Sequence, residues 1–200
     1  MKNFIILLLT MISVTVLAEN NELKKEDVIP SIRDYYSKTT SFQSDFKQNF
    51  YHKAYKKNRT SNGKVAFKRD LKMKWSYINP ERKYIISNGK TIWIYEPENE
   101  QVFKSSVKNS EMEKAAQFIF GKEGLFDDYN IKAFKKSSKY GKIEVHLTPK
   151  AKQSSYKLVI LYFSENFTLK TTQAIDNFDN INTIEYIDSK KNNVIKDDFF

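Results

Sequence analysis

The side chains able to carry out covalent or acid–base chemistry are few in this 200-residue chain. Its two histidines are His52, in a basic stretch, and His146, between two aliphatic residues, and it has no cysteine. Neither a G-x-S-x-G nucleophile motif nor an H-E-x-x-H zinc motif occurs. The adjacent pairs Asp127-Asp128 and Asp197-Asp198 lack the alternating spacing of a calcium loop. We therefore expect no enzymatic activity, no cofactor and no metal site.

Large apolar side chains are abundant instead. The chain holds 15 phenylalanines, 12 tyrosines and two tryptophans. Such side chains either fill a tight core or line an irregular pocket that takes a flexible apolar ligand. Composition alone favours the packed core.

The positive charge is spread over the chain. The formal net charge is +10, but the lysines and arginines lie mostly in scattered, turn-like stretches. This pattern favours a solvated basic surface over a nucleic-acid-binding site.

The first 18 residues are typical of a secretory signal peptide. A charged start at residues 1–3 precedes an apolar run over 4–17, and Val16-Leu17-Ala18 fits a cleavage site before Glu19. The alternative, a membrane anchor, is less favoured because spanning a bilayer takes about 20 apolar residues. We expect an exported domain over residues 19–200 that is held together without disulfides. Without a cysteine, the chain is not expected to be a lipoprotein itself.

Residues 63–102 predict an antiparallel meander. Met73, Trp75 and Tyr77 alternate with polar residues, which is the period of a half-buried strand. Asn88-Gly89 separates two further apolar runs and is a strong hairpin signal. The polar stretch 58–63 before the meander is predicted to be a turn. Further strands are expected over 142–147, 156–163, 167–175 and 181–187, a regular spacing that suggests a sandwich or barrel.

Two helices are predicted. Residues 27–37 carry an apolar stripe, with Asp27 as a cap and Pro30 in the first turn. Residues 111–120 follow a serine cap and end at a glycine. The second helix finishes with three large apolar residues, which form either a helix end buried on several sides or the tip of a lid. Phe42, Phe46 and Phe50 are spaced four apart and fit a helix face or a strand equally well.

The motif order of the meander resembles that of the LolA family of periplasmic lipoprotein carriers. The shared pattern is G-x-V-x-F-K-R, then W-x-Y-x-x-P, then S-N-G-K-T-I-W-I-Y-x-P and Q-V, and a weaker likeness runs from about Ser41 to Lys170 or beyond. The resemblance implies a mainly β fold with helices. It implies an incomplete, unclosed antiparallel β-barrel covered by a helical lid, and it favours a strand for the three phenylalanines.

The resemblance also implies a function. A family member is a periplasmic monomer that takes up the acyl chains of triacylated lipoproteins from an inner-membrane ABC lipoprotein-releasing complex. It then delivers them to an outer-membrane acceptor, and it binds no nucleic acid. The alternative is a periplasmic carrier or sensor of other lipids, fatty acids or glycolipids, that uses the same cavity.

The resemblance assigns a lid latch to Arg69. The guanidinium is expected to donate to lid carbonyls near Ile119 and Phe120, because its five donors lie in one rigid plane. The family often has proline after this arginine, whereas this chain has Asp70, which would compete for the same donors.

The acyl-chain cavity is expected to be lined by alternate residues of the meander. The predicted lining residues are Met73, Trp75, Ile92 and Ile94, with Phe118 and Phe120 from the lid. Alternation identifies residues that share a face but not which face is inside, so Trp93 and Tyr95 remain open as alternatives.

Overall fold

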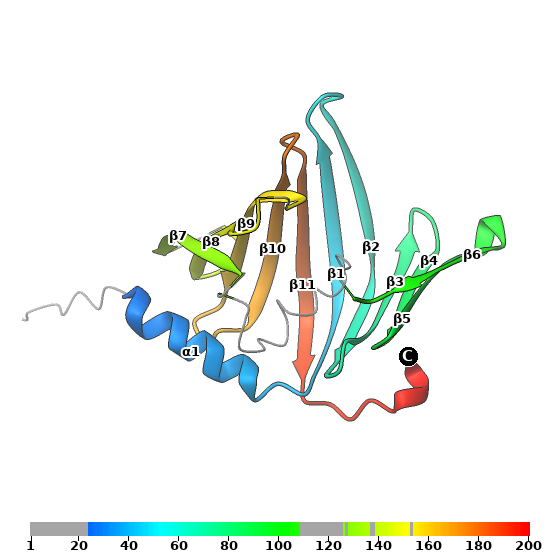
Figure 1. Cartoon of the computed structure of the whole chain (residues 1–200), viewed down its shortest axis with the longest axis horizontal. Helices are drawn as coiled ribbons and strands as arrows, with labels where there is room; N and C mark the ends of the chain where they lie inside the picture. Colours follow the sequence, from blue (N-terminus) through cyan, green and yellow to red (C-terminus); the bar gives the residue numbers. More distant parts are fainter. Residues whose placement is uncertain (1–23, 109–125, 127, 137–138, 153) are drawn as a thin grey trace, which may run out of the picture.

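The computed structural model describes residues 24–200 except 109–125, 127, 137–138 and 153 (Figure 1). Its strands form one eleven-stranded antiparallel sheet in the order β6-β5-β4-β3-β2-β1-β11-β10-β9-β8-β7. The strands are β1 (Ser41–His52), β2 (Lys57–Lys68), β3 (Lys72–Asn79), β4 (Lys83–Asn88), β5 (Thr91–Glu96), β6 (Gln101–Ser106), β7 (Tyr129–Lys136), β8 (Ile143–Pro149), β9 (Tyr156–Phe163), β10 (Leu169–Asp176) and β11 (Ile181–Lys191). The helical elements are α1 (Lys25–Ser37) and the 3-10 turns η1 (Pro97–Asn99) and η2 (Asp197–Phe199).

The sheet is curved but not closed. Strands β6 and β7 stand at its two ends in the described chain, and α1 lies along one side of it (Figure 1). The predicted mainly β, unclosed antiparallel fold is therefore confirmed. The predicted helix over 27–37 is α1, whereas the expected helix over 111–120, with Phe118, Ile119 and Phe120, lies outside the described residues.

The strand predicted for Phe42, Phe46 and Phe50 is confirmed as β1. The turn predicted over 58–63 is wrong, because these residues belong to β2 and pair along their whole length with β1. Cross-strand pairing here overrides the turn preference of the asparagines and Gly63. The glycine is still required, since a Cβ at this position would lie 2.0 Å from the Ser76 carbonyl oxygen.

The register of the meander decides which residues share a face. Met73 of β3 stands opposite Ser87 of β4, which in turn stands opposite Ile92 of β5. Trp75, Ile85 and Ile94 form the next row in the same way. Residues directly opposite in an antiparallel sheet point to the same side.

Helix α1 packs its apolar stripe on that same side of the sheet. Val28, Ile32 and Tyr36 are buried in one cluster with strand residues of both halves of the sheet. The Tyr36 ring lies edge-on to Phe163 of β9, with 6.2 Å between centroids. Within the described part of the chain, no helix has the length and hydropathy needed to cross a bilayer.

Candidate functional site

The side of the sheet on which α1 packs is apolar and rich in rings, and α1 itself lies at the β7–β11 end of the sheet (Figure 1). Met73 is fully buried and Trp75 is 6% exposed. The Trp75 ring lies edge-on to Phe46 and Phe67, with 4.9 Å and 5.7 Å between centroids. These ring contacts contribute to the burial of Trp75. We call this side of the sheet the apolar face, and its members on β1 to β5 are Phe42, Phe46, Val65, Phe67, Met73, Trp75, Tyr77, Ile85, Ile92 and Ile94.

The four predicted lining residues of the meander come together on the apolar face. Ile92 is buried and Ile94 is half-buried, in register with Met73 and Trp75 respectively. Trp93 and Tyr95 point to the other side of the sheet, where Tyr95 is exposed.

Trp75 also carries a polar group into this apolar setting. Its indole Nε1 is buried and has no hydrogen-bond partner among the described residues. A buried donor without an acceptor costs about 1–3 kcal/mol. The sequence could not indicate this, because it depends on which neighbours surround the ring.

Among the pockets in the described part of the molecule, two adjoin β1 to β3, on opposite sides of the sheet. One, of about 250 Å³, is at the rim of the apolar face and is lined mostly by polar side chains, among them Gln48, Arg59 and Ser61. The other, of about 430 Å³, lies over the outer surface of β2 and β3 beside Lys74 and Phe199. We refer to the first as the rim cavity.

Arg69 lies in the turn between β2 and β3 and holds the end of α1. Its Nε donates to the Thr39 carbonyl oxygen at 2.9 Å, and a second guanidinium nitrogen donates to the Ser37 carbonyl oxygen. Its backbone N–H donates to the Thr40 carbonyl oxygen at 3.1 Å. Ser37 is the last residue of α1, and the last carbonyls of a helix lack partners within the helix and carry partial negative charge, so a guanidinium suits it.

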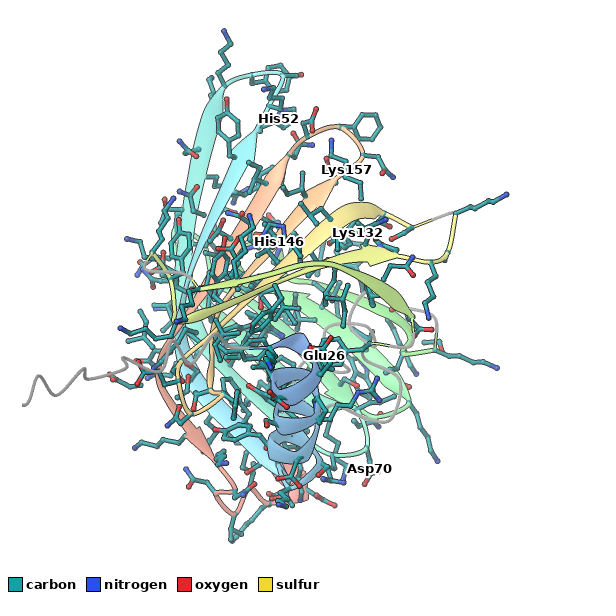
Figure 2. The ribbon with its side chains drawn as sticks, turned by 90° about the vertical axis from the view of Figure 1, so that its left-hand side faces the viewer. Glu26, His52, Asp70, Lys132, His146 and Lys157 are labelled. Atoms are coloured by element: carbon teal, nitrogen blue, oxygen red, sulfur yellow. The ribbon has the colours of Figure 1, made fainter. Side chains whose placement is uncertain are left out.

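The expected partners of Arg69 were elsewhere in the sequence. The carbonyls near Ile119 and Phe120 lie outside the described residues, so the contact predicted with them remains a prediction. Asp70 was expected to compete for the donors of Arg69, but an Arg69–Asp70 pair is not among the ion pairs of the described residues. Figure 2 shows that α1 runs from Glu26 toward the end of the molecule where Asp70 lies.

The other side of α1 is fixed by the turn between β9 and β10. The buried Tyr36 hydroxyl accepts a hydrogen bond from the Leu169 backbone N–H at 2.9 Å. Tyr35 and Thr168 share a hydrogen bond at 2.9 Å between their hydroxyls. Burial strongly raises the pKa of Tyr36, so its hydroxyl stays neutral. The end of the helix is therefore held from both halves of the sheet.

The turn that carries Arg69 also holds the C-terminal segment, on the outer surface. Lys68 Nζ donates to Asp197 Oδ1 at 2.6 Å, and Lys72 Nζ lies 2.7 Å from Asp197 Oδ2. Hydrogen bonds from the two ammonium groups lower the pKa of Asp197 to about 2. Sequence reasoning missed this contact, although the spacing of the two lysines around a turn could have indicated a shared face.

The two histidines lie in different parts of the sheet. His52 is at the end of β1, and His146 is in β8, where it pairs with Glu144. Figure 2 labels both histidines and shows them apart. In the ranges that the structure describes, no three histidine, aspartate or glutamate side chains gather as a metal site.

Comparison with known proteins places the chain in one family. Residues 37–200 match the family described as "Outer membrane lipoprotein carrier protein LolA". The "Outer-membrane lipoprotein carrier protein" of Nitrosomonas europaea is 24% identical over 176 residues, which cover 88% of this chain and 84% of that protein. The protein of the same name from Neisseria meningitidis serogroup B is 27% identical over 158 residues, 79% of this chain and 74% of that protein.

The fold is also found among solved structures. An uncharacterized conserved protein from Thermus thermophilus superposes with a TM-score of 0.51 at 9% sequence identity, over 85% of this chain and 88% of that one. At this identity the likeness concerns the fold alone. The family match covers most of the chain, and this chain therefore belongs to the LolA family.

Proposed function

We propose that this protein is a periplasmic carrier that shelters the acyl chains of lipoproteins on the apolar face, on the side of the sheet where α1 packs. In this proposal it takes lipoproteins from an inner-membrane ABC lipoprotein-releasing complex and delivers them to the outer membrane. The observation that carries the proposal is the apolar face itself. Its rings and aliphatic side chains lie on the same side of the sheet as α1, whose end is attached to the sheet by a few polar contacts. Membership of the family supports the same conclusion.

Energetics explain why such a carrier needs a closed state. Burying one methylene yields about 0.8 kcal/mol, so an acyl chain of ~15 methylenes would gain ~12 kcal/mol. Two or three chains would exceed the limit of ~20 kcal/mol on non-covalent affinity. Release is possible only if cargo binding disrupts other favourable contacts.

The contacts between α1 and the sheet supply that opposing free energy. Val28, Ile32 and Tyr36 belong to the same buried cluster as Phe42 and Phe67 of the apolar face, so acyl chains that spread along this side of the sheet would compete with them. Displacing α1 also breaks the bond that Arg69 donates to Ser37, the last residue of the helix. Arg69 is thus the latch of the closed state, through carbonyls at the end of α1.

Trp75 gives the bound state a polar anchor. An ester or amide carbonyl at the head of an acyl chain would accept from the indole N–H, which has no partner in the described ranges. This contact would favour an acylated head group over a simple alkane in the apolar face.

The direct test is to isolate the protein from the periplasm of its own host and identify what travels with it by mass spectrometry. Triacylated polypeptides in a stoichiometric complex are the expected result. Free fatty acids or glycolipids without polypeptide would favour the alternative carrier, and an empty protein under conditions of active lipoprotein export would reject both.

The latch is tested by comparing Arg69→Leu with Lys64→Leu. Arg69→Leu should load lipoprotein normally and deliver it poorly, because the closed state no longer competes with cargo. Lys64 lies on β2, the strand before the turn of Arg69, and pairs with Asp45 at 2.7 Å on the exposed side, so its variant should behave as wild type. Unchanged delivery by Arg69→Leu would reject the latch.

A further inference from the structure

The geometry points to a docking surface for an anionic lipid membrane at the joined ends of two hairpins. The turns are residues 53–56, between β1 and β2, and 177–180, between β10 and β11, and we call residues 53–57 and 177–180 the hairpin tip. Figure 1 shows these hairpins extending farthest from the body of the sheet, at the end away from α1. The tip is separate from the apolar face and goes beyond the proposed carriage of lipoproteins.

Each turn exposes a large aromatic ring. Tyr55 is 71% exposed and Phe178 is 81% exposed. The two turns are joined by a hydrogen bond, and each thus presents exposed apolar surface that would gain free energy on being covered. Exposed aromatic rings flanked by lysines anchor proteins at the boundary between lipid head groups and acyl chains.

The free charge of the tip is positive. Residues 53–57 include Lys53, Lys56 and Lys57 and no acidic residue. None of the three takes part in an ion pair among the described residues. Lysines placed this way attract anionic lipid head groups, an attraction that salt weakens.

The acidic side chains of the second turn are already engaged. Asp179 pairs with Lys157 of β9, and Lys53 adds a weaker attraction to the same carboxylate. Asp176 accepts from two backbone N–H groups of its own turn, at 2.8 Å and 2.9 Å. These carboxylates therefore shape the turn and leave most of the positive charge of the first turn uncompensated.

The two turns are fixed relative to one another. The Lys53 backbone N–H donates to Asn180 Oδ1 at 2.9 Å, and the His52 ring supports the Tyr55 ring with 4.5 Å between centroids. A preorganised patch loses little conformational entropy on binding. Two narrow turns offer little of the ~800 Å² per partner that a stable protein interface buries, whereas a lipid surface needs no matching shape.

Docking at the tip would orient the rest of the molecule. Phe50 and His52 lie on the same side of β1 as Phe46 and lead from the tip to the apolar face, with 6.2 Å between the centroids of the Phe50 and His52 rings. The rim cavity, which Phe50 also lines, lies on this path. A membrane contacting Tyr55 and Phe178 therefore lies nearest the end of the apolar face that bears the rim cavity.

The test is cosedimentation of the mature protein with vesicles of about 70% phosphatidylethanolamine and about 30% phosphatidylglycerol, an anionic mixture. The double variant Tyr55→Ser/Phe178→Ser should lower partitioning at least about tenfold, because both rings lose contact with lipid. Replacing the three tip lysines by glutamine should lower it about fivefold per lysine at low salt. Val194→Ser is the matched control, since Val194 is 98% exposed beyond the opposite end of β11 near other lysines, and it should partition as wild type.

Circular dichroism and thermal unfolding of each variant establish that the fold is intact, as expected for exposed positions. Absence of binding to anionic vesicles would overturn the proposal, and so would equal binding by the aromatic double variant. Tip-dependent binding to a protein partner in the absence of lipid would replace the membrane by that partner. Lipoprotein loading is measured separately, so failure of the docking surface and failure of the carrier function are distinguishable.

Discussion

The two halves of the sheet differ in how completely they are packed. Beneath α1, strands β8 to β10 contribute aliphatic residues that are almost wholly excluded from solvent, such as Val145, Leu147 and Leu161. In the meander, burial declines from β3 to β6. Ile94 of β5 is half-buried, and Phe103 of β6, in register with it, is exposed. One half has the packing of a structural core, and the other has apolar surface that its own strands do not fully cover. Under the proposed function, the first half supplies stability and the second supplies the surface for ligand.

The comparison is tested most strongly by truncating one side chain in each half. Leu161→Ala should lower the free energy of unfolding by about 2–5 kcal/mol, because it leaves a cavity in a close-packed region. Ile94→Ala should cost about 1 kcal/mol, since its side chain is already partly solvated. Urea denaturation of both variants measures the difference, and equal losses would remove the distinction between the halves.

A smaller effect is expected where α1 joins the aliphatic half. Tyr36→Phe removes the hydroxyl that accepts from the Leu169 N–H, leaving a buried donor unpaired at a cost of about 1–3 kcal/mol. Tyr35→Phe serves as the matched variant, because the Tyr35–Thr168 bond is only part-buried and should contribute about 0.5–1.5 kcal/mol. Thermal unfolding of the pair gives the ranking, and a larger loss in Tyr35→Phe would show that the helix is fixed differently.

The smallest effect concerns the outer surface of the meander and depends on pH. The pKa of Asp197 is lowered from 3.8 to about 2, so its contribution is fully present above pH 3.8 and is lost as the pH falls toward 2. Backbone NMR signals of the last residues should shift over this interval as the segment leaves Lys68 and Lys72. Asp197→Asn should abolish the transition, whereas the exposed neighbour Asp198→Asn should retain it. A transition that survives Asp197→Asn must have another origin.

Periodicity was enough to predict most of the fold. Alternation located β3 and the strands from β8 to β11, and Asn88-Gly89 located the turn between β4 and β5. The polar half of β2 was missed because its pairing partners lie in β1 and the sequence shows only turn-forming residues. Strand β7, over Tyr129–Lys136, was not predicted at all.

The candidate site was predicted less completely. Alternation grouped Met73 with Trp75, but only the register of the sheet shows that they share a side with Ile92 and Ile94. Arg69 was identified through the family resemblance, yet its observed partners lie 30 and 32 residues earlier in the chain. The Lys68–Asp197 contact spans 129 residues, and no local pattern reports contacts of that kind.

The turn between β2 and β3 holds α1 through Arg69 on one side and the C-terminal segment through Lys68 and Lys72 on the other. Two elements attached to one short loop form a linked equilibrium, in which the coupling free energy acts equally in both directions. If release of the C-terminal segment makes it easier for the helix to leave, then release of the helix makes it equally easier for the segment to leave. Under the proposed function, affinity for a ligand on the inner side of the sheet would then be adjustable from the outer surface.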